Sequence, residues 1–470
     1  MTLPLVRPTL RHPTGNRKHH KMTFSFAPPL WLASSGTSSV SMPQCSRIRG
    51  IMALCLLLVA CIPSTSAEYV PRVDTLSQSE LFEPVDSIKV LAPTHFPKPT
   101  HWLGDENVTI IVKPSYGQHR PNQDAVLAYA EGYRLSYYIM FLDTLTKTGF
   151  RGDVVLAIAE ERILKPDVLD YLLIFTKGDT DKPNVVVYQQ ELYCDPKDGA
   201  PGHHRALSRS GDTDVFQFCQ LPNVYGWKKP DGTYTPAPDP REGRVVATIR
   251  YEWYWIWASQ YSPSSWIMLI DSRDSFFQRT PFANLPRTQN IESVGGLLYF
   301  FGENANATRL GISKKNQKWI KNGYGDATIQ AVKDKPTICS GSTMGEQIAI
   351  ETYLRAMVNE HDEAQVRMTG SDQGFHNYLY YSSKLTGAST IRKLIVWEQG
   401  RGFINNMGAL RTKPFKEWGC YDPDKHVVYQ WDGSISPVVH QWDRDKELHG
   451  WMNGEKHREY NDWWQAQKQR

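Results

Sequence analysis

Short apolar runs alternate with segments of helical spacing along the first half of the chain. The runs "VTIIVK", "AVLAYAEGY", "DVVLAIA" and "NVVVYQQ" are typical of strands, because they are short, apolar and rich in β-branched residues. Between them, "RLSYYIMFLDTLTKTG" and "KPDVLDYLLIFTK" show helical spacing, and Gly149 closes the first as a C-cap signal. This alternation predicts an α/β fold with a mostly parallel mixed sheet and helices on both faces.

The second half of the chain begins with a segment rich in Pro, Gly, Asp and Ser, at about 194–244. Such turn-forming composition predicts a long insert within the domain. Regular patterning then resumes with a helix in "VVATIRYEWYWIWASQYS" and a strand in "WIMLI". Further helices are expected at about 345–359 and 372–383, and a β-rich end at about 427–440.

These patterns predict one domain at 106–450, with the insert at about 194–244 inside it. Residues 68–105 carry several prolines and are expected to form an irregular stem. The last residues, 451–470, are strongly polar and are expected to pack weakly, as a tail outside the core.

Charge is distributed unevenly along the chain. The whole sequence has 53 Lys and Arg against 49 Asp and Glu, yet residues 1–67 contain basic residues and no acidic ones. The remainder is therefore close to neutral and lacks the basic surface that phosphate backbones require. We expect no nucleic-acid partner.

The N-terminal region has the layout of a secretory signal. Arg47 and Arg49 precede an apolar run at 51–62, and small residues at Thr65 and Ala67 suggest cleavage before Glu68. As a helix this run would span about 18 Å, short of the roughly 30 Å of a bilayer core. A cleaved signal peptide is favoured over a short Golgi-type membrane anchor. Either places the domain in the secretory pathway, in the Golgi or ER lumen or secreted.

Cysteine usage agrees with an oxidising compartment. Four cysteines follow the leader, which permits one or two disulfides; they are Cys194, Cys219, Cys339 and Cys420. The easiest pair is Cys194 with Cys219, because both flank one loop-like part of the insert. Sequons at Asn107 and Asn306 fit glycosylation in the same compartment.

Two carboxylates follow the strand "WIMLI" directly: Asp271 and Asp274. In open α/β sheets, ligands bind beyond the carboxyl ends of the strands. Carboxylates three residues apart can converge on one hard cation, which can neutralise charge on a departing diphosphate. The alternative is a simple Asp-turn in which Asp274 pairs with Arg273 or Arg279.

Three further segments carry candidate chemistry. Asp372 and Gln373 stand at the start of a predicted helix, where the alternative role is stabilisation of the helix N-terminus. His440 ends an apolar strand six residues before Lys446, so the pair could supply a metal ligand and a phosphate contact; a structural histidine is the alternative. Residues 339–341 are expected to form a tight turn whose backbone N–H groups face a ligand.

Taken in order, the segments "DSRD", "CSG", "DQGFHN" and "HQWDRDK" resemble the motifs of a GT-A-type glycosyltransferase that uses a nucleotide sugar. The order is that of the glycogenin-like retaining family, glycosyltransferase family eight. That family has a D-x-D strand end, an N/S-x-G turn, a D-Q-x-x-x-N helix start and an H-x-x-G-x-x-K segment. The resemblance spans roughly 126–446. The chain departs from it at Arg273, in the third position of D-x-D, and at Asp443, where the family has glycine.

The resemblance implies a role for each matching residue. Asp372 and Gln373 would be catalytic residues beside the transferred sugar. The metal, Mn²⁺ or Mg²⁺, would be held by Asp271, Asp274 and His440. The nucleotide sugar would be bound by the turn that includes Ala130 and Tyr133, and by Arg250, Asp271, Ser340, Gly341 and Lys446.

The expected reaction is transfer of a sugar from a nucleoside-diphosphate sugar, a UDP-sugar by resemblance, to a hydroxyl of a glycan, protein or lipid acceptor. One alternative is a non-catalytic nucleotide- or glycan-binding protein on a degenerate GT-A fold, motivated by Arg273 and Asp443. A third reading is a secreted hydrolase that uses Asp271 and Asp274 as its acid/base pair.

Overall fold

The computed structural model describes residues 80–104, 107–161, 164–165, 167–190, 192–195, 202–203, 218–366, 368 and 370–469. The predicted leader, the first part of the stem and part of the insert lie outside these residues. All the described residues belong to one compact unit. No helix in this part of the chain has the length and apolar content needed to cross a membrane.

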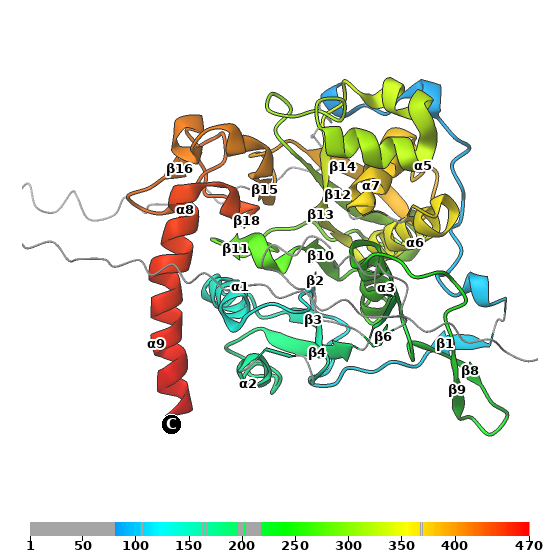
Figure 1. Cartoon of the computed structure of the whole chain (residues 1–470), viewed down its shortest axis with the longest axis horizontal. Helices are drawn as coiled ribbons and strands as arrows, with labels where there is room; N and C mark the ends of the chain where they lie inside the picture. Colours follow the sequence, from blue (N-terminus) through cyan, green and yellow to red (C-terminus); the bar gives the residue numbers. More distant parts are fainter. Residues whose placement is uncertain are drawn as a thin grey trace, which may run out of the picture. The chain divides into compact units, whose positions relative to one another are not determined.

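A seven-stranded sheet forms the centre of the unit (Figure 1). The strand order across it is β14 (Ile391–Trp397), β12 (Gly296–Gly302), β13 (Ile338–Glu346), β10 (Trp266–Ile270), β2 (Ala125–Tyr129), β3 (Asp153–Ala159) and β4 (Asn184–Gln190). β13 runs antiparallel to both of its neighbours, whereas every other adjacent pair is parallel. The start of β13 therefore lies at the same edge as the carboxyl ends of β10 and β2.

Helices cover both faces of this sheet (Figure 1). One face packs against α1 (Leu135–Lys147), α2 (Val168–Leu173) and α9 (His457–Lys468); the other packs against α3 (Val246–Ala258), α5 (Lys314–Val332), α6 (Gln347–Ala364) and α7 (Ser371–Tyr381). Successive strand residues alternate between the two cores, as Val126 and Leu127 do. The predicted α/β class, with a mixed, mostly parallel sheet, is confirmed.

Smaller elements complete the unit. Two small sheets belong to the first half and the insert: β1 (Val108–Ile110) with β8 (Tyr225–Lys228) and β9 (Tyr234–Ala237), and β5 (Tyr193–Asp195) with β6 (Gly202–His203) and β7 (Phe218–Gln220). Two more include the C-terminal strands: β11 (Ser275–Phe277) with β15 (Ile404–Asn406) and β18 (Val438–His440), and β16 (Tyr421–Asp422) with β17 (Val427–Val428). The short helices are α4 (Ile291–Val294) and α8 (Lys446–Trp451). The insert thus contains strands, although its composition suggested turns.

The cysteines divide into two groups. Strands β5 and β7 pair with Cys194 directly opposite Cys219, the register that the predicted disulfide needs. That disulfide stays a prediction. Cys339 and Cys420 are buried free thiols, so a second bridge between them does not form.

The prediction of a weakly packed polar tail is wrong. Tyr460 and Trp464 on α9 are buried in the core, and the Trp464 ring meets the Tyr171 ring edge-on at 5.5 Å. These two residues are four apart and share one face of the helix, while most of the other positions are polar. The low mean hydropathy of the segment concealed this narrow apolar stripe.

The predicted tight turn at 339–341 is also wrong. These residues begin β13, which is hydrogen-bonded on both sides to β10 and β12. Ser and Gly are poor strand formers locally, but pairing with two neighbouring strands outweighs that preference.

Candidate functional site

Two short strands bring the predicted metal ligands together. Asp271 follows the last residue of β10, and a 3₁₀ turn over Ser272–Asp274 leads into β11. β18 pairs antiparallel with β11, so that His440 lies opposite Ser275. The Gln441 N–H also donates to the main-chain oxygen of Asp274, at 2.7 Å. This pairing places His440 beside both aspartates at the carboxyl edge of the sheet.

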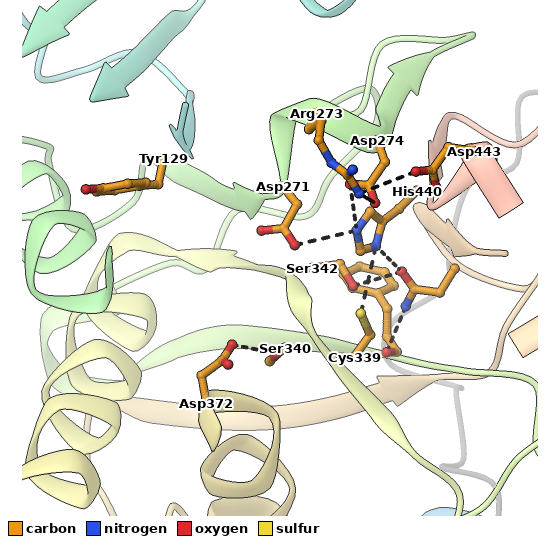
Figure 2. Close-up of polar contacts among 12 residues, drawn as sticks. Tyr129, Asp271, Arg273, Asp274, Cys339, Ser340, Ser342, Asp372, His440 and Asp443 are labelled. Atoms are coloured by element: carbon orange, nitrogen blue, oxygen red, sulfur yellow. Dashed lines mark hydrogen bonds and ion pairs between the residues drawn. The ribbon is translucent and has the colours of Figure 1, made fainter. Parts of the chain in front are cut away.

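The three side chains point toward one another (Figure 2). His440 Nε2 lies 3.9 Å from Asp271 Oδ2 and 3.7 Å from Asp274 Oδ1. One atom from each residue falls within 4.8 Å of the other two. Two ligands of one octahedral magnesium ion are about 2.9 Å apart when adjacent and about 4.2 Å apart when opposite, so both histidine distances lie within the range that a single ion spans.

The histidine is held in a form that suits a metal ligand. His440 is fully buried, and its Nδ1 lies 2.8 Å from Asn406 Oδ1, whose amide group donates to the Phe301 carbonyl at 3.0 Å. Nδ1 is therefore the donor, which leaves the lone pair of Nε2 facing the aspartates. Nε2 is a buried atom with no hydrogen-bond partner among the described residues. An unsatisfied buried nitrogen is costly, and a cation would relieve it.

Arginines hold the far side of each carboxylate. Arg250 contacts Asp271 through Oδ1, and Arg273 and Arg444 approach Asp274 Oδ2 at 3.1 and 3.5 Å. The other oxygen of each aspartate is the one that faces His440. Each carboxylate is thus oriented by a guanidinium while keeping one oxygen for a ligand.

The charge balance of this cluster is negative. Burial raises the pKa of Asp274; His440 counteracts this effect and Asp271 adds to it. Asp443 pairs with Arg273 at 3.3 Å and with Arg444. With Asp372, four carboxylates meet three guanidinium groups, so a diphosphate would need an additional cation here.

Glycine is required at position 341. A Cβ there would lie 2.7 Å from Asp271 Oδ2 and 2.9 Å from His440 Cε1. The carbonyl of Gly341 also accepts the Asp271 N–H at 3.1 Å. Gly341 is therefore a strand residue that leaves room for Asp271 and His440, and its predicted contact with the nucleotide sugar stays a prediction.

A second group of side chains lies beside the first. Arg250 contacts Asp271 with one nitrogen and Asp372 Oδ2 with the other, at 2.7 Å. Ser340 Oγ donates to the same Asp372 oxygen at 2.9 Å (Figure 2). Burial disfavours the charge of Arg250, but Asp271 and Asp372 keep its pKa well above the ordinary value. These contacts join Arg250, Ser340 and Asp372 to the cluster of Asp271, Asp274 and His440.

Gln373 turns toward a residue that the sequence analysis missed. Its side chain lies close enough to Glu303, which follows β12, to lower the pKa of that carboxyl, and its amide donates to Asn316 at 3.0 Å. Burial raises the pKa of Glu303 to about 7, against the opposing effects of Arg411, Gln373 and Arg444. A glutamate at the end of a buried strand was a sequence signal of the same kind as Asp271, but no motif marked it.

The remaining predicted residues differ in how closely they approach the cluster. Ala130 and Tyr133 follow β2 at the same edge of the sheet, and Tyr133 is near enough to Arg273 to raise its pKa. Lys446 begins α8 and is exposed. Arg444, two residues earlier, is the cation that reaches Asp274. The diphosphate role of Lys446 stays a prediction.

No protein-family model matches the chain, and no curated protein matches it in sequence. Among solved structures, the galactosyltransferase LgtC in complex with donor and acceptor sugar analogues is similar, with a TM-score of 0.35 and 9% identity over 72% of this chain and 94% of that one. An active-site mutant of LgtC gives a TM-score of 0.36 and 8% identity over 72% and 95%. At scores this low the likeness carries no argument about function.

Proposed function

We propose that the chain is a metal-dependent glycosyltransferase that moves a sugar from a nucleoside-diphosphate sugar, preferably a UDP-sugar, to an acceptor hydroxyl. The observation that supports this most directly is the buried His440 Nε2, which has no hydrogen-bond partner among the described residues and faces one oxygen each of Asp271 and Asp274. The proposed compartment, the lumen of the secretory pathway, is supported by the sequence of the leader, the cysteine usage and the sequons at Asn107 and Asn306.

In the proposed reaction, the bond between the sugar C1 and the phosphate oxygen breaks, and its electron pair leaves with the diphosphate. A new bond forms between C1 and the acceptor oxygen, and the proton of the acceptor hydroxyl passes to the departing diphosphate. A bound Mn²⁺ or Mg²⁺ would stabilise charge on the leaving diphosphate. Asp271, Asp274 and His440 would hold that ion, and Arg250 would orient Asp271 and Asp372 beside the donor sugar.

The test is calorimetric titration of UDP and GDP into the purified protein, with and without Mn²⁺. We expect binding that needs Mn²⁺ and that falls at least a hundredfold in Asp274→Ala, because removal of a ligand also leaves His440 facing a lone carboxylate. Asp326→Ala is the matched control, since the Asp326 side chain is 71% exposed and pairs only with Lys321 among the residues described. Binding of neither nucleotide by the folded wild type would refute the proposal.

A second candidate is a non-catalytic protein that binds a nucleotide sugar. It is favoured by Arg273, which bridges Asp274 and Asp443 and supplies positive charge where the related motif has a carboxylate. Such a protein would bind UDP with Mn²⁺ but would release no UDP from any UDP-sugar, with or without acceptors. A coupled assay of UDP release across a panel of donors separates the two.

A further inference from the structure

A cleft opens at the same edge of the sheet, beyond the carboxyl ends of β12 and β14. Its volume is about 390 Å³, and its wall includes Glu303, Asn304, Glu398, Gln399, Trp418 and Trp431. β12 is antiparallel to β13, which is antiparallel to β10, so β12 and β10 end at the same edge. The cleft and the cluster of Asp271, Asp274 and His440 therefore share that edge. The volume lies within the range of small-ligand pockets.

The two tryptophans are fixed by their N–H groups. Trp431 Nε1 donates to the Gln399 carbonyl at 2.6 Å, and Trp418 Nε1 donates to the Leu410 carbonyl at 2.8 Å. Trp431 also lies tightly over Gly400, where a Cβ would meet its Nε1 at 2.5 Å. Even so, 37% of Trp431 remains exposed. The rings are held in place with indole surface still available to a ligand.

The polar wall of the cleft is equally ordered. Asn304 Nδ2 donates to Gln399 Oε1 at 3.0 Å, and Gln399 in turn donates to Asn405 at 2.6 Å. Glu398 pairs with Arg401 at 3.2 Å. Aromatic faces bordered by fixed carboxylate and amide groups suit a sugar ring, which offers an apolar face and a rim of hydroxyls.

Glu303 connects this cleft to the donor side. It lines the cleft, and Gln373, the neighbour of Asp372 in sequence, is close enough to lower its pKa. Arg444, which approaches Asp274, is also close enough to lower the pKa of Glu303, although burial brings that pKa to about 7. A hydroxyl bound at Glu303 would therefore lie next to the residues assigned to the donor sugar.

We propose that this cleft is the acceptor subsite and that it binds a neutral carbohydrate, with the sugar against Trp431 and Trp418 and its reacting hydroxyl donating a hydrogen bond to Glu303. The assignment of the hydroxyl as the acceptor rests on the proposed function. The assignment of the cleft as a carbohydrate site does not. Among the described lining residues, Arg401 is already paired with Glu398, so the cleft offers no free cation to an acidic sugar and neutral chains are the expected class.

The experiment uses the full-length protein on an array of neutral and acidic glycans without nucleotide, followed by titration of the best neutral binder. We expect at least a tenfold loss of affinity in Trp431→Ala and in Glu303→Gln, with Mn²⁺-dependent UDP binding unchanged in Trp431→Ala. Trp463→Ala is the matched control, because Trp463 is 42% exposed on α9 and contacts Tyr171. Trp418→Ala replaces Trp431→Ala if the melting temperature of Trp431→Ala falls well below that of wild type.

The outcomes separate this inference from the proposed function. UDP binding with no neutral glycan bound at all would overturn the carbohydrate subsite and leave the transferase proposal standing. Glycan binding that survives both tryptophan substitutions would overturn it as well. Glycan binding abolished by Trp431→Ala, in a protein that binds no nucleotide, would support the carbohydrate site while refuting the transferase.

Discussion

Two clusters of arginines and carboxylates differ sharply in how completely they are paired. In the first, at the end of the insert, Glu252 Oε1 accepts hydrogen bonds from Arg241 at 2.8 Å and from Tyr225 at 2.7 Å. Its Oε2 accepts from Arg241 at 2.9 Å and from Arg244 at 2.6 Å. Asp239 accepts from both arginines too. Both oxygens of each of these carboxylates have a cationic donor.

The second cluster, at Asp271, Asp274 and His440, keeps one oxygen of each aspartate without a cationic donor among the described residues. The pKa values of Glu252 and Asp274 reflect this difference in pairing. Burial alone would raise the pKa of Glu252, but Arg241 and Arg244 lower it to about 2. For Asp274 the effect of burial dominates, and its pKa is raised. The first cluster pins the insert to α3, whereas the second has unused capacity for a cation.

The largest expected effect on stability comes from breaking the first cluster, around Glu252. Glu252→Gln removes the charge that compensates Arg241 and Arg244, and breaking a buried pair in this way costs about 3–5 kcal/mol of unfolding free energy. Urea denaturation measures it, with Glu363→Gln as the control, because the Glu363 side chain is 66% exposed. A loss as small as that of the control would show that the insert does not depend on this network.

A smaller effect is expected at Glu303, whose pKa is raised from 4.5 to about 7. Between these values the native state keeps a proton that the unfolded state has lost, so unfolding free energy falls as pH rises through this window. From pH 5 to pH 8, wild type should lose about 1–3 kcal/mol more than Glu303→Gln, which cannot ionise. Urea denaturation of both proteins at the two pH values checks this. Equal losses would place Glu303 in a more hydrated environment.

The sequence predicted well those parts of the fold whose signal is local. β2, β3, β4 and β10 are short apolar runs, and each forms a strand of the central sheet. β13 was missed because its strand conformation comes from two neighbours distant in sequence. α9 was missed because only Tyr460 and Trp464 of its polar sequence are buried.

The candidate site shows the same division. Motif order identified Asp271, Asp274 and His440, and the structure brings these three together. Motif order did not indicate Arg444 as a partner of Asp274, since that contact depends on the pairing of β18 with β11. Glu303 was missed for a similar reason, because its role depends on contact with Gln373 across the sheet edge.

The smallest effect on stability is expected from a substitution in the second cluster, at Asp274. Asp274 is only 5% exposed, and burial disfavours its charge, so Asp274→Asn should change the unfolding free energy by no more than about 1 kcal/mol and is as apt to raise it as to lower it. The stabilisation by bound metal should differ far more between wild type and Asp274→Asn. Mn²⁺ at a hundred times its dissociation constant would stabilise wild type by about 2.7 kcal/mol, and Asp274→Asn should lose most of that gain. Thermal unfolding with and without Mn²⁺, beside Asp326→Asn, measures both quantities. If Asp274→Asn lost several kcal/mol of unfolding free energy without metal, the cluster would instead be a structural network like that of Glu252. A loss of that size occurs only when the ion pairs of the carboxylate stabilise the fold.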